Sequence, residues 1–186
     1  AGFSMVAALK SAALDGARPL RMRLRAVRLL APGFVNLPAT FITELSYSSD
    51  AEMRAQAAWL TGVRGNAAEH HLLVRLLDDP DAFVRRRAAE ALSRCTKHGG
   101  VEKLVLRLGD TDRYVRYAAM TALVHQPTED CFSAAARLEH PAVLSRLLVA
   151  AHLRKARPEV DAAIAVIMRL LNASVPTAED ELDRRR

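Results

Sequence analysis

The chain has 186 residues, of which 51% are hydrophobic and 26% are charged, and its formal charge is +6 at neutral pH. This composition excludes a disordered chain, and no stretch approaches the roughly 20 consecutive apolar residues that a membrane-spanning helix needs. The two cysteines, Cys95 and Cys131, do not make a disulfide framework, so a reducing, cytoplasmic location is the default expectation.

Arginine provides nearly all of the positive charge. The 27 basic side chains include only four lysines, which leaves 27 − 4 = 23 arginines. Arginine binds carboxylates, phosphates and aromatic faces better than lysine does, although a GC-rich genome produces the same excess. The charge therefore permits an acidic partner without requiring one.

The first residues of the chain, Ala1 to Met5, lack the basic segment and the apolar run of a signal peptide. Because the chain starts at Ala1 rather than at methionine, we expect it to be a fragment of a longer protein.

A unit with a period of 31 residues recurs in residues 18–31, 49–62, 80–93 and 111–124. Each copy contains an apolar residue followed by arginine: Met22-Arg23, Met53-Arg54, Val84-Arg85 and Val115-Arg116. Apolar residues follow at spacings of four, seven and eight, with Thr61 as the one departure, and this pattern forms one stripe of an α-helix. The last three copies have an aspartate at the expected N-cap position, namely Asp50, Asp81 and Asp112, whereas the first copy has Pro19.

A second apolar run precedes these helices, in residues 72–77 before the third copy and in residues 104–108 before the fourth. Turns are predicted between the runs at residues 78–80 and 109–111. Each unit is therefore predicted to be a helix, a tight turn and a second helix. Neither helix can bury its apolar stripe alone, so neighbouring units must stack.

Residues 79–92, with the sequence Asp-Pro-Asp-Ala-Phe-Val-Arg-Arg-Arg-Ala-Ala-Glu-Ala-Leu, resemble the short HEAT-like repeat of bacterial phycobilin-lyase-type proteins, and residues 110–119 repeat the pattern. The resemblance implies an all-α fold, a right-handed α–α superhelix (solenoid) of about five to six stacked HEAT-like hairpins. We expect one domain over residues 1–186, with its best repeats in 18–124 and degenerate or capping helices in 128–186. Helices are expected there over residues 141–155 and 158–172, before a charged tail at 177–186.

The repeated arginines, Arg23, Arg54, Arg85 and Arg116, lie at the border of the apolar stripe. The resemblance implies that they link adjacent units together with Asp50, Asp81 and Asp112. We therefore expect a structural ladder, and the alternative is a row of anion-binding side chains.

The opposite face of the second helices carries aromatic residues and arginines. In HEAT-like solenoids these helices form the concave wall, and such side chains are common at binding hot spots. The predicted partner-binding residues are Arg21, Arg25, Arg28, Trp59, Phe83, Arg86, Arg87, Tyr114 and Tyr117. The alternative is that an aromatic side chain folds back over its own turn, or that Trp59 packs on a neighbouring unit.

Catalytic and metal-binding motifs are missing from the sequence. Glu69, His70 and His71 form the one local cluster of metal-type residues, but adjacent histidines on a helix point about 100° apart and do not converge on one ion. Residues 95–98 have CxxH spacing without a second ligand pair, and the two glycines at 99–100 predict a turn rather than a phosphate loop. We expect no enzyme activity, no catalytic residue, no cofactor and no metal.

The primary functional hypothesis is a non-catalytic scaffold that binds a protein helix or an acidic peptide segment on its concave face. The alternative is a nucleic-acid-binding solenoid, although Glu52 and Glu90 interrupt the basic face. A chromophore-lyase-like role is implied by the resemblance alone. A fourth hypothesis makes the chain the repeat segment of a larger enzyme, with other domains of the parent chain as partners. No membrane partner is expected.

Overall fold

The structure is a computed structural model that describes residues 4–32, 37–64, 70–95, 99–137 and 141–153, together with the single positions 164 and 168. This part of the chain folds into ten helices without strands. The first helices of the five hairpins are α1 (Met5–Leu14), α3 (Ala39–Ser46), α5 (His70–Leu76), α7 (Val101–Arg107) and α9 (Thr128–Ala136). Their second helices are α2 (Leu20–Leu29), α4 (Ala51–Arg64), α6 (Ala82–Leu92), α8 (Arg113–Leu123) and α10 (Pro141–Leu153).

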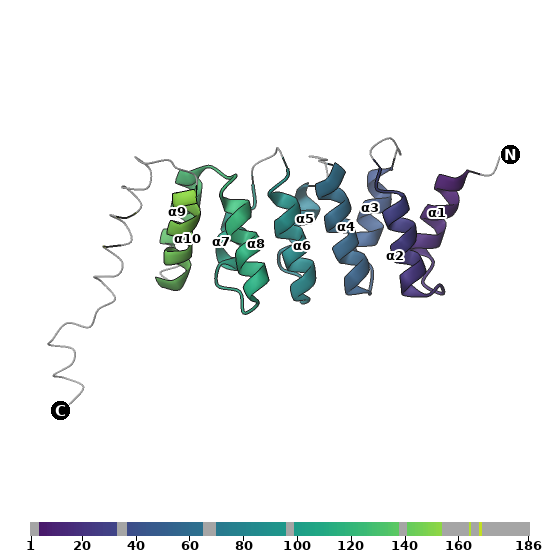
Figure 1. Ribbon diagram of the computed structural model, residues 1–186, viewed down its shortest axis with the longest axis horizontal. Coiled ribbons are helices and arrows are strands. Elements are labelled where there is room, and N and C mark those ends of the chain that lie inside the picture. The colour runs from purple at the N-terminus through teal and green to yellow at the C-terminus, as the bar shows by residue number, and fades with distance from the viewer. Residues whose placement is uncertain are drawn as a thin grey trace, which may run out of the picture.

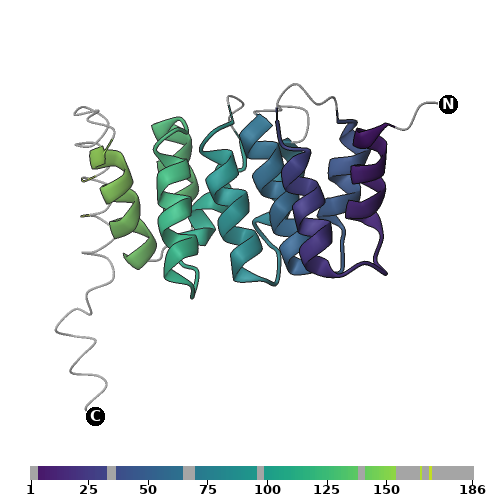
Figure 2. The same cartoon turned by 45° about the vertical axis from the view of Figure 1, so that its right-hand side comes forward.

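The hairpins stand side by side in a row and form two layers, as Figures 1 and 2 show. The second helices α4, α6 and α8 pack directly against one another, and each also packs against the first helix of its own hairpin. This arrangement is an all-α helical solenoid, which confirms the predicted fold class. The helix expected at 141–155 is present as α10, whereas the helix expected at 158–172, apart from positions 164 and 168, and the tail at 177–186 lie outside the described residues.

The predicted apolar stripe is buried in the second, third and fourth hairpins. The first position of the stripe is 0% exposed at Met53, Val84 and Val115. In the first hairpin Ala26 and Leu30 are buried as predicted, but the prediction is wrong for Met22, which is 51% exposed, and for Leu29, which is 56% exposed. The internal stripe positions face the preceding hairpin, and the described chain places no second helix on that side of α2.

The second helices also bury a flank that the sequence pattern assigned to the open face. Ala55 is 0% exposed, Gln56 is 7% exposed and Ala118 is 4% exposed. The physical reason is that each internal second helix has a neighbour on both sides, so a single stripe does not account for its buried surface.

The fifth hairpin keeps the repeat pattern at a shorter spacing. Val143, Leu147, Ala150 and Ala151 reproduce the spacings of zero, four, seven and eight, and all four are buried. The distance from Val115 to Val143 is 143 − 115 = 28 residues, three fewer than the regular period. Leu144 stands in the place of the repeated arginine, so the fading of the register after Pro127 reflects a shortened unit.

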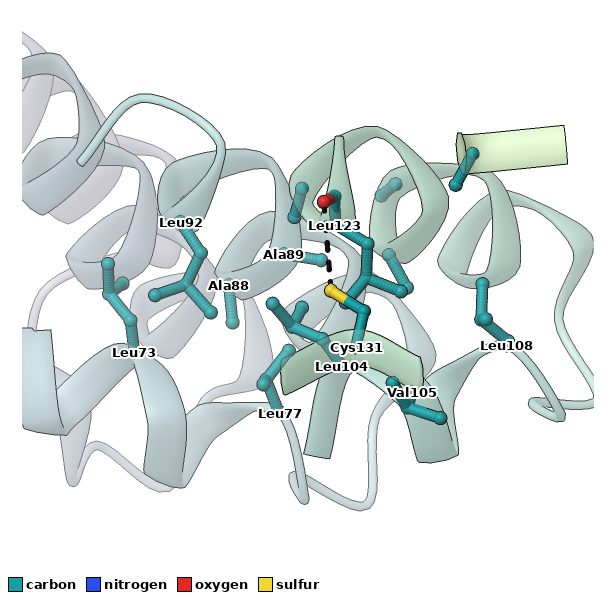
Figure 3. Packing of buried hydrophobic residues seen from close by; sticks show 14 of the residues in the cluster. Leu73, Leu77, Ala88, Ala89, Leu92, Leu104, Val105, Leu108, Leu123 and Cys131 are labelled. Carbon is teal, nitrogen blue, oxygen red and sulfur yellow. Dashed lines mark hydrogen bonds between the residues drawn. The ribbon is translucent and has the colours of Figure 1, made fainter. Parts of the chain in front are cut away.

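Small side chains allow the helices to pack closely, as the core around α6, α7 and α8 illustrates (Figure 3). Ala88 and Ala89 on α6 and Leu104 on α7 are fully buried. Both cysteines are buried free thiols, as expected. The Cys131 Sγ donates to the carbonyl of Leu123 at 4.0 Å, and burial raises the pKa of the Cys95 thiol.

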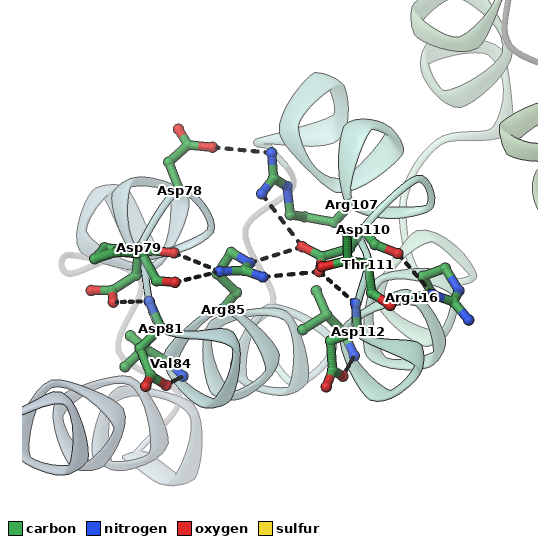
Figure 4. A network of polar contacts seen from close by, with 12 residues as sticks. Asp78, Asp79, Asp81, Val84, Arg85, Arg107, Asp110, Thr111, Asp112 and Arg116 are labelled. Carbon is green, nitrogen blue, oxygen red and sulfur yellow. Dashed lines mark hydrogen bonds and ion pairs between the residues drawn. The ribbon is translucent and has the colours of Figure 1, made fainter.

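The repeated arginines join adjacent hairpins. The Arg85 Nε and Nη2 atoms donate to the two carboxylate oxygens of Asp110 at 2.8 and 2.9 Å. The Nη1 atom of the same guanidinium donates to the carbonyls of Asp79 and Pro80, both at 2.9 Å (Figure 4). Arg85 therefore binds the turn of its own hairpin and the turn of the next one.

Arg54 makes the same set of bonds one hairpin earlier. Its Nε and Nη2 atoms donate to the Asp79 carboxylate at 2.7 and 2.8 Å. Its Nη1 atom donates to the carbonyls of Ser48 and Ser49, both at 3.0 Å. The expected structural ladder is present, but the carboxylates that Arg54 and Arg85 bind are Asp79 and Asp110 rather than Asp81 and Asp112.

The two aspartates of each Asp-x-Asp turn have different roles. Asp81 caps α6 by accepting from the N–H groups of Phe83 at 2.8 Å and Val84 at 3.2 Å. Asp112 caps α8 in the same way, so two of the three predicted N-caps, Asp81 and Asp112, are confirmed. A cap side chain is occupied by its own helix, which leaves the earlier aspartate of the turn to bind the arginine.

The ladder changes at both ends of the repeat array for a reason visible in the sequence. The carboxylate partner lies 25 residues after the arginine, as 79 − 54 shows, and this position is Ser48 for Arg23 and Pro141 for Arg116. Arg23 binds the Asp50 carboxylate instead. Arg116 makes no ion pair within the described residues and donates only to the carbonyls of Asp110 and Thr111, at 2.8 and 2.9 Å.

Burial alone would raise the pKa of Asp79. The hydrogen bonds from the Arg54 guanidinium and from the Asp81 N–H outweigh it, so the net pKa of Asp79 is lowered. The pKa of Asp110 is lowered for the same reasons, because the Arg85 guanidinium and the Asp112 N–H donate to its carboxylate. Ionised carboxylates in these turns therefore stabilise the folded chain.

Asp79→Asn is expected to lower the free energy of unfolding at neutral pH by about 2–3 kcal/mol, because two charge-assisted bonds to Arg54 are lost while the bond to the Asp81 N–H is kept. The lowered pKa means that this stabilisation is present above the unfolded value of about 3.9 and is lost as the pH falls through the folded pKa. Urea unfolding measured between pH 7 and pH 2.5 should therefore show that the free energy of unfolding falls less with decreasing pH in the variant than in the unmodified chain.

The neighbouring Asp78 provides the matched control, because its exposed carboxylate pairs with Lys103 and Arg107 at the surface. Asp78→Asn should cost less than about 1 kcal/mol. Equal losses for the two variants would contradict the structural role of the ladder.

Gly62 on α4 lies directly against α6. A Cβ atom added there would lie 2.7 Å from both the Cα and the Cβ of Ala91 on α6. Gly62→Ala should therefore lower the free energy of unfolding by about 1–3 kcal/mol despite the better helix propensity of alanine. Gly16→Ala, where nothing lies within 4 Å, should be neutral or slightly stabilising in the same thermal melts.

Candidate functional site

The predicted partner-binding residues fall into separate regions of the second-helix layer. Phe83, Arg86 and Arg87 lie on α6, and Tyr114 and Tyr117 lie beside them on α8. Three predicted arginines lie exposed on α2, at the N-terminal side of the row, namely Arg21, Arg25 and Arg28. Trp59 lies on α4, between these two regions.

A groove runs between α6 and α8, and we call it the tyrosine groove. It has a volume of about 270 Å³. Its lining residues are Arg86, Glu90, Ser93, Arg94, Tyr114, Tyr117, Ala118 and Thr121. The side chains of Tyr114 and Tyr117 are large but remain 48% and 67% exposed. Two exposed tyrosines on one wall present apolar ring surface together with hydroxyl groups, which is typical of interaction sites.

The α6 wall of the tyrosine groove carries a compensated charge cluster. Glu90 accepts from the Arg86 Nε at 2.7 Å and from the Arg87 Nη1 at 2.9 Å. Arg87 also lies over the Phe83 ring, with 5.2 Å between the guanidinium carbon and the ring centroid. One carboxylate therefore balances part of the charge of two arginines, and the two predicted arginines are less free than the sequence pattern indicates.

The α8 wall holds Tyr114 between two arginines. The guanidinium carbon of Arg86 lies 5.3 Å from the Tyr114 ring centroid, and that of Arg113 lies 4.6 Å from it. The Arg113 Nη2 also donates to the Tyr114 hydroxyl at 2.7 Å. Cation–π contacts of this kind fix the ring orientation, so the groove has a preformed wall.

Arg94 and Tyr117 provide the uncommitted groups of the tyrosine groove. Within the described residues, Arg94 forms no ion pair and the Tyr117 side chain forms no hydrogen bond. Arg94 was missed by the sequence analysis, although extending the α6 register by seven residues from Arg87 places it on the same face. Arg113 was also missed, because it precedes Tyr114, the first residue of this helix that the sequence analysis predicted to bind a partner.

Trp59 and the α2 arginines do not join the tyrosine groove. Trp59 is half-buried and packs against the N-terminal core formed by α1 to α4. This packing supports the alternative interpretation, in which Trp59 packs on a neighbouring unit instead of binding a partner. Arg21 and Arg25 line a separate groove between α1 and α2. Of the other predicted residues, Arg86, Tyr114 and Tyr117 line the tyrosine groove, whereas Arg28, Phe83 and Arg87 line neither groove.

Metal-type residues do not converge in the part of the chain that the structure describes, where no group of three or more His, Cys, Asp or Glu side chains could hold an ion. His70 is buried at the start of α5 and His71 is exposed, and Glu69 lies outside the described residues. The CxxH spacing that starts at Cys95 also continues into residues that are not described, 96–98. None of the helices in the described ranges is long and apolar enough to cross a membrane.

Comparison with protein families matches residues 38–124 to HEAT repeats, and this range extends from α3 to α8. The match confirms the expected HEAT-like repeats within this range. Among solved structures, the chain is similar to the crystal structure of an engineered protein, with a TM-score of 0.54 and 20% identity, over 92% of this chain and 98% of that one. A likeness at this identity supports the fold alone. Comparison with curated proteins found no match.

Proposed function

The chain carries HEAT repeats over residues 38–124, and on that basis we propose that it is a non-catalytic interaction module whose tyrosine groove binds a segment of another protein. HEAT repeats generally mediate protein interaction or scaffolding. The observation that carries the proposal is the pair of exposed tyrosines, Tyr114 and Tyr117, beside Arg94, whose guanidinium forms no ion pair with any described residue.

The chemistry of the groove favours a peptide segment with acidic side chains. Arg94 and Arg113 supply positive charge without an ion-pair partner among the described residues, whereas the one carboxylate of the groove, Glu90, is already held by Arg86 and Arg87. A bound carboxylate could accept bidentate hydrogen bonds from Arg94, and apolar side chains could lie on the Tyr117 ring. The partner is then either a separate protein or another domain of the parent chain.

Further parts of the proposal rest on individual features of the chain. The buried free thiols of Cys95 and Cys131 suit a reducing compartment, which we take to be the cytoplasm. No cofactor is needed for a binding role.

Nucleic acid is the second candidate ligand, because exposed tyrosines beside arginines can stack on bases and contact phosphates. Glu90 weakens this alternative, since a carboxylate in the groove repels a phosphate backbone.

Tyr117→Ala is expected to reduce partner capture at least tenfold, because truncation of a central aromatic residue at an interface typically costs about 2 kcal/mol or more. The measurement is quantitative mass spectrometry of the proteins that the immobilised full chain retains from a cell extract. The variant should keep its thermal stability, since the Tyr117 side chain is 67% exposed.

Tyr47 provides a matched control on a different part of the surface. Its ring is 65% exposed and is stacked by Arg75 at 4.1 Å, so Tyr47→Ala removes the same kind of side chain outside the tyrosine groove. Capture should be retained in this variant. Equal capture by Tyr117→Ala and the unmodified chain would contradict the proposal, and salt-sensitive retention of a labelled duplex in its place would favour nucleic acid.

A further inference from the structure

The groove between α1 and α2, which we call the N-terminal groove, exposes residues that the rest of the solenoid buries. Met22 and Leu29 are 51% and 56% exposed. Their equivalents one to three periods later are 0–2% exposed: Met53, Leu60, Val84, Ala91, Val115 and Ala122. In the internal hairpins this flank is covered by the preceding second helix, so the N-terminal groove has the shape of a seat for a helix.

The floor of the N-terminal groove is apolar. Leu9 and Ala12 of α1 and Met22, Ala26 and Leu29 of α2 line it, and its volume is about 530 Å³. Met22 and Leu29 are seven residues apart, which corresponds to about 10 Å along the helix axis. A floor of this length accepts two turns of a partner helix with apolar side chains at spacings of three, four and seven.

The rim of the N-terminal groove is basic. Arg18, Arg21 and Arg25 border the floor. Arg18 pairs with Asp15 at 3.1 Å, whereas Arg21 and Arg25 form no ion pair within the described residues. Neither α1 nor α2 contains an acidic residue to balance them. Because the two guanidinium groups are four residues apart, they lie one turn apart on the same side of α2.

We propose that the N-terminal groove is a second docking site, which binds an amphipathic helix with apolar residues on one face and carboxylates along its border. The apolar floor selects helical side chains at the spacing of the repeat, and the unpaired arginines select acidic over basic partners. This site shares no residue with the tyrosine groove, so it stands or falls independently of the function proposed above.

The test uses two synthetic helical peptides of about 18 residues, or five turns, with leucines at spacings of three, four and seven. One peptide carries glutamates along the border of the leucine stripe, and the other carries lysines at the same positions. Binding to the full chain is measured by fluorescence anisotropy at moderate ionic strength. The glutamate peptide should bind more tightly than the lysine peptide by on the order of tenfold.

Charge reversal and apolar truncation then locate the site. The double variant Arg21→Glu/Arg25→Glu should lose the preference for the glutamate peptide and bind the lysine peptide instead. Leu29→Ser should weaken both peptides. Arg137→Glu, at an exposed arginine at the end of α9 that lines neither groove, should leave the binding of both unchanged. Met22, Leu29, Arg21 and Arg25 are exposed, so unchanged thermal melts are expected in these variants.

Several results would overturn the proposal. Equal binding of the two peptides to the unmodified chain would remove the role of the arginine rim, and unchanged binding in the charge-reversed variant would place the site elsewhere. If the unmodified chain dimerises and Leu29→Ser abolishes the dimer, the occupant of the N-terminal groove is a second copy of the chain. A labelled duplex that binds through Arg21 and Arg25, without competition from the glutamate peptide, would identify nucleic acid.

Discussion

The bidentate bonds of Arg54 and Arg85 to the turn of the next hairpin fix how each unit sits on its neighbour. The same guanidinium groups hold the carbonyls that precede their own helices, so one side chain joins three segments of chain. The alanine-rich second helices could slide or rotate against one another with little change in buried area, because their contact surfaces are smooth. A directional, largely buried bond removes that freedom, and it sets the rotation of α6 and α8 about their axes.

That rotation determines which residues reach the surface. Arg85 points to the next turn, so Arg86 and Glu90, one and five residues later, face the side of α6 that borders α8. The same geometry turns Tyr117 outward beside the buried Ala118 and Ala119. The tyrosine groove therefore depends on the ladder. The arginine bonds fix the rotation of α6 and α8, and this rotation decides which side chains of the two helices face solvent and form the walls of the groove.

The arginine ladder ends at one end of the solenoid and the covered part of the apolar stripe ends at the other. The two ends therefore expose different kinds of surface. The residue 25 positions after Arg116 is Pro141, which has no carboxylate, so within the described residues the ladder stops before α10 while the apolar stripe continues to Ala151. At the other end the stripe itself is uncovered, at Met22 and Leu29. The N-terminal groove therefore follows from the same repeat that builds the core.

Sequence reasoning could reach the fold because the 31-residue period, the stripe and the N-cap aspartates are local patterns that the packing of one helix pair enforces. It failed where a contact depends on a neighbour. A helix wheel cannot show that Ala55 and Ala118 are buried, or that Met22 is left exposed within the described chain. It also could not choose between Asp79 and Asp81 as the partner of Arg54, because the two carboxylates are separated by a single residue. Trp59 and Tyr117 lie on the same predicted open face of the second helices. Only the packing shows that Trp59 is half-buried against the N-terminal core and that Tyr117 is exposed.

The central claim is that a protein partner contacts the tyrosine groove, and site-specific photo-crosslinking tests it most directly. A benzoylphenylalanine side chain introduced in place of Tyr117, and separately in place of Tyr47, would be irradiated in cells that express the full chain. The account predicts a discrete crosslinked protein from position 117, with the contact peptide rich in acidic residues, and no equivalent product from position 47. Crosslinks to nucleic acid from position 117, or the same products from both positions, would contradict it.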